Sequence, residues 1–332
     1  MNKKKLYIGF DTSNYTTSVA VCDENGMILG NIKCPLPVKQ GERGLRQSDA
    51  VFAHVKNFPQ IARELRKLVY SFDKNETEFA AAACSLTPRD IEGSYMPCFL
   101  VGRAVAETVC AAFNIPLYYT SHQTGHVMAA LSSACINEGL DINSFMNREH
   151  YALHFSGGTT EILSVSPDRQ KVFEIKRIGG TSDASAGQII DRIGVALGYS
   201  FPCGAEIDAE AMKFQGKIKS CSPSVKGLEC NLSGLENKAE KMINDGVDTA
   251  EISAYILEYI AKTAARLVAS AKERYGEKPV VFAGGVMSSA YIRCSLSHLG
   301  MFSSAEYSSD NAAGAALICK YMYEMASNAH GG

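Results

Sequence analysis

The sequence predicts a two-lobed α/β protein, and three observations lead to this prediction. Strand-rich segments recur near the start and the middle of the 332-residue chain, each is followed by sequence with helical periodicity, and no low-complexity linker separates the halves. Both strand-rich segments begin with a strand, a turn of small polar residues and a second strand. This shared order suggests an internal duplication with a period close to half the chain.

The first strand-rich segment has the pattern of a β-meander. "KLYIGFDTS" at 5–13 and "TTSVAVCD" at 16–23 alternate apolar and polar residues, and "DENG", which ends at Gly26, provides a turn before "MILGNIK" at 27–33. Apolar residues at helical spacing over 48–72 then predict an amphipathic helix.

The second meander begins at the middle of the chain. "HYALHFSGGTTEILSVS" at 150–166 predicts a strand, a tight turn containing glycine and a second strand, and "VFEIKRI" at 172–178 predicts a third. A helix is expected over 183–199, with Ser182 and Asp183 as the candidates for its N-terminal cap.

The last third of the chain contains the strongest helical pattern. Residues 250–276 are amphipathic throughout and end at Gly276, which favours a helix that stops at this glycine. The segment 278–299 predicts a buried strand that runs into two glycines and a further helix.

The composition is that of an ordinary globular protein, with 46% hydrophobic and 20% charged residues. The apolar runs are far shorter than the ~20 residues that span a bilayer, and Asp11 interrupts the apolar stretch that follows the basic start, so we expect neither a membrane span nor a signal peptide. A net charge of −2 excludes a strongly basic surface, so any nucleic acid would be bound by a local patch or by a partner.

The cysteines indicate a cytoplasmic protein. There are eleven, an odd number, the closest two are Cys221 and Cys230, and most lie in apolar runs. Buried, reduced thiols fit this pattern better than a disulfide framework, and no CxxC pair is present for a structural zinc.

Three turns combine glycine or hydroxyl residues with a preceding strand, an arrangement that exposes backbone N–H groups to an anion. They are "DTSNYTTS" at 11–18, "SGGTT" at 156–160 and "AGGVMSS" at 283–289. One such turn is common in any protein. Three of them, two in repeated meanders, have the layout of the actin-like ATPase architecture, in which two duplicated lobes bind a nucleotide between them.

Two histidines, His122 and His126, lie four residues apart in "SHQTGHVMAA". On a helix these positions share one face, so both imidazoles can reach one metal ion, although the same spacing also suits ordinary packing. The residues between them are Gln123, Thr124 and Gly125, without the glutamate of a metallopeptidase HExxH motif. We therefore do not expect peptidase activity.

Six sequence blocks resemble one protein family from end to end. The blocks are "GFDTS", "HQTGH", "SGGTTEIL", "AGQIIDRIGVALGYSFPCG", "FAGGV" and "SSDNAAGAAL". In order and spacing the chain resembles the TsaD family, the bacterial and organellar relatives of the KEOPS catalytic subunit, which were once described as O-sialoglycoprotein endopeptidases. The resemblance implies the ASKHA fold of actin-like ATPases, Hsp70 and sugar kinases, with residues 1–118 and a C-terminal helix at about 310–328 in one lobe and 119–309 in the other.

The resemblance also implies an activity, a metal and partners. Members of this family transfer a threonylcarbamoyl group from threonylcarbamoyl-AMP to N6 of adenosine 37 in tRNA that reads ANN codons, and they work with TsaB-like and TsaE-like proteins. The family's metal ligands fall on His122, His126 and Asp310, a set that suits Fe or Zn. A homodimer is left open.

The same resemblance assigns residues to an adenine nucleotide, which is threonylcarbamoyl-AMP, ATP or AMP. Its nucleotide contacts fall on His154, Phe155, Ser156, Gly157, Gly158, Asp191, Gly204 and Ser289. The first turn, with Asp11, Thr12 and Ser13, is the candidate phosphate loop. Because the mixed anhydride is already activated, the residues mainly have to orient it, and no catalytic nucleophile is assigned.

Several positions depart from the family pattern. The family's residues at these positions are acids, a histidine and an asparagine, and the chain has Tyr15, Thr16, Thr159, Ala184, Gln188 and Ser289. The departures surround the expected phosphate and adenine positions, whereas the three expected metal ligands are retained. This combination suggests a divergent paralogue, so a nucleotide-binding scaffold or regulator, or a different acceptor, stays open beside the transferase, and a kinase of the same fold is a more distant alternative.

Overall fold

The protein is described by a computed structural model, in which residues 3–37, 45–218, 220–307 and 312–330 are described. Contacts between residues divide the chain into two compact units. The first contains residues 1–129, 168–174 and 310–332, and the second contains residues 130–167 and 175–309. Each unit is built around a β-sheet of its own.

The first unit has a five-stranded sheet in the order β3-β2-β1-β4-β5. The strands are β1 (Lys4–Thr12), β2 (Thr16–Asp23), β3 (Ile28–Pro35), β4 (Thr77–Thr87) and β5 (Leu117–Ser121). β1, β2 and β3 pair antiparallel, as the predicted meander requires, and β4 and β5 join β1 in parallel. The first meander is therefore confirmed.

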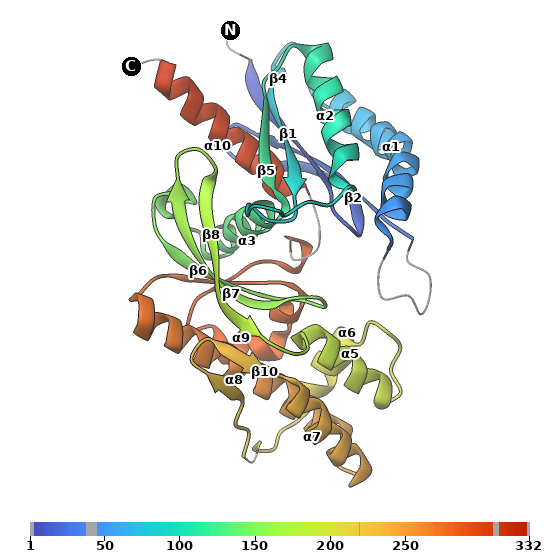
Figure 1. The fold of residues 1–332 in the computed structure, drawn as a ribbon, viewed down its shortest axis with the longest axis vertical. Coiled ribbons are helices and arrows are strands. Elements are labelled where there is room, and N and C mark those ends of the chain that lie inside the picture. Colours follow the sequence, from blue (N-terminus) through green and yellow to red (C-terminus); the bar gives the residue numbers. More distant parts are fainter. Residues whose placement is uncertain (1–2, 38–44, 219, 308–311, 331–332) are drawn as a thin grey trace. The chain divides into compact units, whose positions relative to one another are not determined.

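Helices cover both faces of this sheet (Figure 1). Leu6, Ile8 and Phe10 of β1 share a core with α1 (Gln47–Tyr70) and α2 (Phe99–Phe113). The alternate side of β1 contacts α10 (Ala313–His330) so closely that a Cβ on Gly9 would lie 2.3 Å from the backbone nitrogen of Ala316. Because successive side chains of a strand point to opposite faces of the sheet, α1 and α2 lie on one face and α10 lies on the other.

The second unit has a seven-stranded sheet in the order β12-β11-β6-β7-β8-β10-β9. The strands are β6 (His150–Phe155), β7 (Thr160–Asp168), β8 (Val172–Thr181), β9 (Ser224–Lys226), β10 (Glu229–Asn231), β11 (Val280–Ala283) and β12 (Met301–Phe302). The antiparallel pair of β6 and β7 begins the second predicted meander, and β8 completes it. The repeated strand pattern is confirmed in both sheets.

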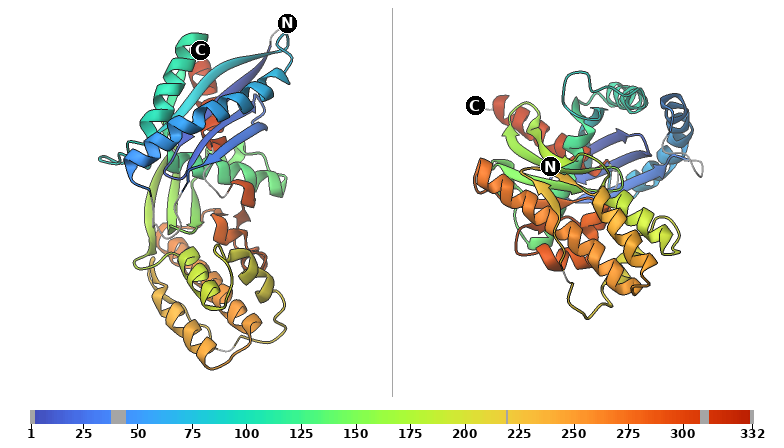
Figure 2. Two further views of the ribbon diagram at one scale, coloured as in Figure 1. Left: turned by 90° about the vertical axis from the view of Figure 1, so that its right-hand side faces the viewer. Right: turned by 60° about the horizontal axis from the view of Figure 1, so that its bottom comes forward.

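The helices of the second unit pack against this sheet. They are α5 (Ala186–Ala196), α6 (Gly204–Ala211), α7 (Ser233–Asn244), α8 (Thr249–Tyr275) and α9 (Ala290–Leu296), with short elements α4 (Asn143–Met146), η1 (Gly285–Ser288) and η2 (Ala305–Tyr307). Tyr151, Leu153 and Phe155 of β6 share their core with the buried face of α8. α7 and α8 lie side by side in both views of Figure 2. α8 ends at Gly276, which has a φ of 88°, as the sequence predicts.

The N-terminal cap of α5 differs from the prediction. The cap is Ser185, whose side chain accepts from the backbone N–H of Gln188 while the Gln188 side chain accepts from the backbone N–H of Ser185. Asp183 instead accepts from the backbone N–H groups of Leu232 and Ser233 at the start of α7, and these bonds hold the pKa of its carboxyl far below the ordinary value, against the effect of burial. Ser182 and Asp183 were therefore wrong as caps, because a tertiary contact takes the carboxylate.

Two further expectations can be compared with the structure. Within the described part of the chain, no helix is long and apolar enough to cross a membrane. The eleven cysteines, all of which are described, are unbridged, and eight of them are buried. Burial raises the pKa of many of these thiols, to about 11 for Cys135 and to about 12 for Cys230. A raised pKa keeps the thiol protonated and therefore unreactive at neutral pH.

Candidate functional site

The histidine pair lies at the start of α3 (His122–Glu138). Because the two residues are four positions apart on one helix, their rings meet edge to face, with centroids 4.3 Å apart and an interplanar angle of 83°. The Nε2 atom of His126 lies 2.9 Å from the Nε2 atom of His122. The two ring nitrogens therefore face each other within hydrogen-bond distance on one side of the helix, as the spacing predicts.

The second nitrogen of His122 is held by Asp11. The Nδ1 atom of His122 lies 3.0 Å from Oδ1 of Asp11, whose side chain is only 1% exposed. A carboxylate can only accept here, so Nδ1 carries the hydrogen and Nε2 presents its lone pair. A carboxylate behind an imidazole is the arrangement that orients histidine ligands in metal sites.

The residues present fit a divalent metal. At metal–nitrogen lengths of about 2.0–2.1 Å, two imidazole nitrogens on one ion lie roughly 3.0–3.4 Å apart, close to the 2.9 Å between the Nε2 atoms. No group of three or more His, Cys, Asp or Glu side chains that could hold a metal occurs among the described residues. Asp310, the predicted third ligand, lies outside them.

The helix α10 contacts α3 between the two histidines. A Cβ on Gly314 would lie 1.8 Å from the carbonyl oxygen of Gly125, so only glycine allows this approach of the two backbones. Gly314 comes four positions after Asp310 in the sequence.

The first predicted phosphate loop begins with the last two residues of β1. Asp11, Thr12 and Ser13 are all buried, with exposed fractions of at most 2%. The hydroxyl of Thr12 donates to the carbonyl oxygen of Cys98 and accepts from the backbone N–H of Gly102, so the end of β1 is docked on the first turns of α2. The Asp11 carboxylate contacts the His122 ring. The groups of this loop that suit an anion are therefore its backbone N–H groups.

The second predicted loop, 156–158, is docked on the start of α5. The Ser185 hydroxyl donates to the carbonyl oxygen of Gly157 at 2.6 Å, and the backbone N–H of Gly187 donates to the carbonyl oxygen of Ser156 at 3.2 Å. A Cβ on Gly187 would lie 2.6 Å from the Cα atom of Gly157. The loop thus lies against a helix N-terminus, a favourable position for a phosphate.

One turn further along α5, Asp191 faces the start of α6. Its Oδ1 atom accepts from the backbone N–H of Cys203 at 2.9 Å, and burial raises the pKa of its carboxyl. Cys203 directly precedes Gly204, and a Cβ built on Gly204 would have no atom within 4 Å apart from those of its chain neighbours and its own helix backbone. Asp191 and Gly204 are therefore neighbours beside open space, which suits a ligand contact.

Two more of the predicted residues, His154 and Ser289, lie at the glycine-rich turn 283–289. Gly284 has a φ of 95°, and a Cβ there would lie 2.2 Å from the carbonyl oxygen of Phe155 and 2.8 Å from Cδ2 of His154. Ser289 caps α9 and donates its hydroxyl to Asp208, whose carboxylate also accepts from the backbone N–H groups of Ala290 and Tyr291. Ser289 therefore serves as a cap and a partner of Asp208.

Close contacts link the predicted nucleotide residues of the second unit in one series of neighbours. They run from His154 and Phe155 beside Gly284, to Ser156 and Gly157 against Gly187, to Asp191 beside Gly204, and along α6 to Asp208 and Ser289. Sequence reasoning missed Ser185 and Asp208 as supports of this arrangement. The S-x-x-Q spacing of Ser185 and Gln188 was a signal for the first, whereas Asp208 had none because its partners are about eighty residues away.

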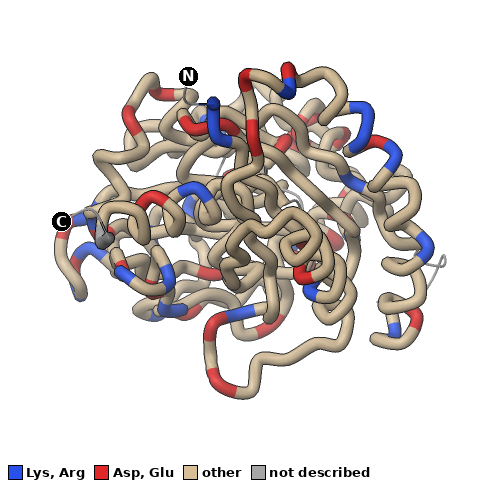
Figure 3. Tube along the Cα trace, turned by 90° about the horizontal axis from the view of Figure 1, so that it is seen from above, with Lys and Arg blue, Asp and Glu red and all other residues tan. Residues whose placement is uncertain are grey.

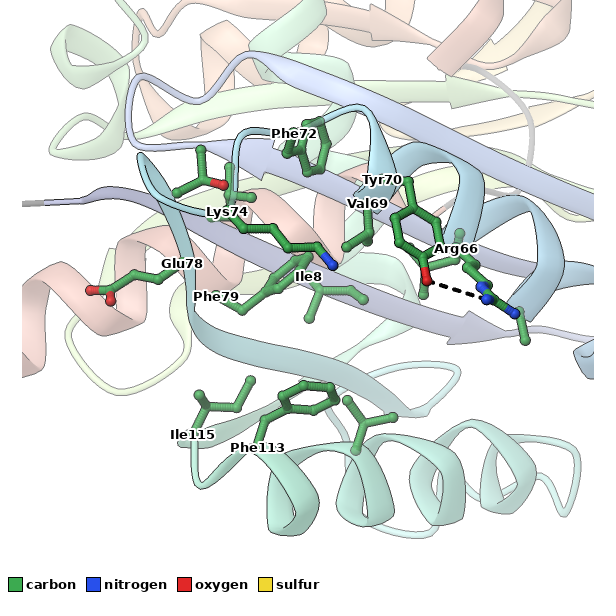
Figure 4. Close-up of a pocket in the computed structure, with 15 residues that line it drawn as sticks. Ile8, Arg66, Val69, Tyr70, Phe72, Lys74, Glu78, Phe79, Phe113 and Ile115 are labelled. Atoms are coloured by element: carbon green, nitrogen blue, oxygen red, sulfur yellow. Dashed lines mark hydrogen bonds between the residues drawn. The ribbon is translucent and has the colours of Figure 1, made fainter.

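A large apolar cavity lies elsewhere in the first unit (Figure 4). It has a volume of about 550 Å³ and lies between α1, α2 and the first residues of β1 and β4. Its lining is mainly aliphatic and aromatic, with Arg66 and Lys74 near Tyr70 at one side. It contains none of the predicted site residues, so its size alone does not make it the candidate site.

In Figure 3, Lys and Arg positions are interspersed with Asp and Glu positions along the Cα trace. This distribution agrees with the net charge of −2.

Comparison with known proteins gives a consistent result over most of the chain. The family model TsaD, described as tRNA N6-adenosine threonylcarbamoyltransferase, matches residues 53–317. Proteins named tRNA N6-adenosine threonylcarbamoyltransferase are similar to the chain in Limosilactobacillus reuteri (strain DSM 20016), with 27% identity over 90% of this chain and 83% of that protein, and in Malacoplasma penetrans (strain HF-2), with 28% identity over 93% and 96%.

Solved structures support the predicted fold. HypF of T. kodakarensis matches with a TM-score of 0.58 and 13% identity over 98% of this chain, which spans about half (48%) of that HypF chain. Component A of the (R)-2-hydroxyglutaryl-CoA dehydratase of Acidaminococcus fermentans matches with a TM-score of 0.51 and 14% identity over 96% of this chain and 99% of that one. At such identities the likeness shows the fold alone, and it confirms the ASKHA architecture.

Proposed function

Because the chain belongs to the TsaD family of tRNA N6-adenosine threonylcarbamoyltransferases, we propose that it transfers the threonylcarbamoyl group of threonylcarbamoyl-AMP to N6 of adenosine 37 in ANN-decoding tRNA, and that the transfer depends on a metal. The observation that carries this proposal is the pair of Nε2 atoms of His122 and His126, 2.9 Å apart, with Asp11 behind His122. Such a site can hold an anionic donor in position, and transfer of an already activated acyl group needs orientation but no nucleophilic side chain.

We propose that His122, His126 and Asp310 bind one Fe or Zn ion. The orientation of the two imidazoles supports the histidines, and the contact of Gly314 with Gly125 supports Asp310, because it brings the chain four residues beyond Asp310 to the backbone between the histidines. When bound, the ion would polarise a phosphate or carbamoyl oxygen of the donor.

The adenine nucleotide is assigned to the second unit. Backbone N–H groups of residues 156–158, at the N-terminus of α5, suit a phosphate, and the carboxylate of Asp191 suits the hydroxyl groups of a ribose. The open space at Gly204 leaves room for a ligand next to Asp191. His154, Phe155 and Ser289 complete the proposed contacts, and the backbone of Asp11–Ser13 is the proposed second anion contact.

The reaction makes modest demands on side chains. The N6 amine of adenosine attacks the carbamoyl carbon, a C–N bond forms, the C–O bond to the phosphate breaks, and AMP leaves while the amine proton passes to solvent. The protein contributes orientation and a charge-stabilising environment for the leaving phosphate. The partners of the reaction are proposed to be tRNA and TsaB-like and TsaE-like proteins, and help from a partner in binding tRNA fits a chain with a net charge of −2.

The test is direct transfer with defined components. The full chain, with its metal content measured and with its TsaB-like and TsaE-like partners present, is incubated with threonylcarbamoyl-AMP and an ANN-decoding tRNA. We expect AMP and N6-threonylcarbamoyladenosine in equal amounts, and no product on a tRNA with guanosine at position 37. Neither AMP nor modified adenosine from metal-loaded protein would refute the proposal.

A second candidate is a divergent paralogue that binds a nucleotide and regulates or supports a catalytic relative. Tyr15 and Thr16, which stand where the family has acids, favour it, and the Tyr15 side chain is 48% exposed beside the candidate phosphate loop. Nucleotide binding without transfer in the experiment above would favour this candidate.

A further inference from the structure

His54 is a buried residue of α1 that reaches the candidate phosphate loop. Its side chain is completely buried, and its Nε2 atom lies 2.9 Å from the backbone carbonyl oxygen of Ser13. Its Nδ1 atom lies 2.8 Å from the hydroxyl of Thr17, on the strand that follows the loop. The ring therefore connects α1 to both ends of the turn between β1 and β2.

The partners of His54 define its tautomer. A carbonyl oxygen only accepts, so Nε2 must carry the hydrogen. Burial lowers the pKa of His54, which favours the neutral ring. In that form Nδ1 accepts from the hydroxyl of Thr17, which in turn accepts from the side-chain amide of Asn57 at 3.0 Å. The direction of each hydrogen bond in this chain is thus determined, from Asn57 through Thr17 and His54 to Ser13.

A second residue of α1 holds the same loop. Gln47 lies two helical turns before His54, on the same side of the helix, and its side-chain amide donates to Oδ1 of Asn14 at 2.8 Å. Its carbonyl oxygen accepts from the backbone N–H of Cys98 at 3.3 Å. The loop is therefore attached to α1 at two successive residues, Ser13 and Asn14.

The bond to Ser13 sets the orientation of one peptide group. The peptide between Ser13 and Asn14 is trans, since the cis bond among the described residues is Phe201–Pro202. In a planar trans peptide the C=O and N–H groups point in opposite directions. A carbonyl of Ser13 that is directed to His54 therefore turns the backbone N–H of Asn14 away from α1.

We propose that His54 is a positioning residue of the transfer reaction: by binding the Ser13 carbonyl it directs the backbone N–H of Asn14 toward an anionic oxygen of the substrate, a phosphate or carboxylate. This inference rests on the proposed function and deepens it. His54 does not touch the substrate. It acts through the candidate phosphate loop, which also contains Asp11, the residue that orients His122.

Two substitutions separate the two bonds of His54. In His54→Gln the side-chain amide can still reach the Ser13 carbonyl as a donor, whereas in His54→Asn the shorter side chain keeps an acceptor for Thr17 and loses Ser13. His150→Asn, a fully buried histidine in the second unit, serves as the control for the general cost of changing a buried imidazole. Steady-state kinetics with threonylcarbamoyl-AMP and hydrogen exchange of a peptide that covers residues 11–18 are measured for all three variants.

We expect His54→Asn to raise the KM for threonylcarbamoyl-AMP about threefold to tenfold, the effect of one hydrogen bond, with kcat changed less than twofold. Amide hydrogen exchange of residues 11–18 should accelerate by a similar factor. In His54→Gln, both the KM and the exchange rate should be close to those of the parent. Equal KM and equal exchange in His54→Asn and His54→Gln, with melting temperatures lowered alike, would overturn the inference. If the parent protein transfers nothing to tRNA, the proposed function fails, while the exchange of residues 11–18 still decides whether His54 positions the loop.

Discussion

The contact between Asp11 and His122 leads to the sharpest prediction, which concerns metal affinity. Asp11→Asn keeps the size of the side chain and retains an oxygen that can accept from Nδ1 of His122, but it removes the charge. Asp11→Ala removes the acceptor as well. Because Asp11 is 1% exposed and its Oδ1 atom lies 3.0 Å from Nδ1, water does not readily replace the lost partner.

The expected magnitude follows from this geometry. Loss of a carboxylate behind a histidine ligand typically lowers metal affinity by about 10–100-fold. We expect about tenfold for Asp11→Asn, which keeps a weaker hydrogen bond, and a loss toward a hundredfold for Asp11→Ala. These factors correspond to about 1.4 and 2.7 kcal/mol of binding free energy.

The assay is a competition between protein and a chelator for Zn²⁺, with Fe²⁺ in a parallel anaerobic series. Asp23→Asn, a carboxylate at the end of β2, is the matched control and should bind metal like the parent. His126→Ala should lower bound metal to background. Parent-like affinity in both Asp11 variants would refute the orienting role of Asp11, and parent-like metal content in His126→Ala would return the histidine pair to ordinary packing.

Two other predictions concern the second unit. Gly187→Ala places a Cβ 2.6 Å from Cα of Gly157 and 2.7 Å from the carbonyl oxygen of Ser156, so we expect a loss of about 1–3 kcal/mol in unfolding free energy and weaker binding of ATP or AMP by calorimetry. The control Gly234→Ala has no atom within 4 Å of the new Cβ, and equal nucleotide affinity in the two variants would contradict the prediction. Burial lowers the pKa of His150 to about 4, so the unfolded chain takes up a proton at a higher pH than the folded protein does, and stability that is present above pH 6.5 is lost as the pH falls. Between pH 7 and pH 5 this loss is about 2 kcal/mol of unfolding free energy. Urea unfolding at the two pH values should show that His150→Gln reduces the pH dependence of the unfolding free energy by that amount. An unchanged pH dependence would contradict the burial argument.

The periodic elements of this protein were predictable because their signals are local. The strands of both meanders and the helices α1, α5 and α8 were predicted within a few residues, since alternation and helical spacing are properties of neighbouring residues. The same holds for the histidine pair, whose shared direction follows from four residues on one helix. Gly276 likewise ends α8 for a local reason, its positive φ.

Cap propensity alone was insufficient where three neighbouring residues were all good candidates. Ser182, Asp183 and Ser185 are all good helix caps, and the sequence alone favoured the first two. The tertiary structure decides for Ser185, because the Asp183 carboxylate is bound by the start of α7, about fifty residues away. A departure from the family, Gln188, then has a local purpose as the second half of the capping box.

By itself the sequence determined the α/β class, the repeated meanders, the free thiols and the residues that belong to the TsaD family. Only the tertiary structure decided how those residues support one another. It assigned Asp11 to His122 across 111 positions, His54 to Ser13 across 41, and Asp208 to Ser289 across 81. The physical reason is that a hydrogen bond depends on position and direction in space, and for residues so far apart in the chain these are set by the packing of whole helices and sheets.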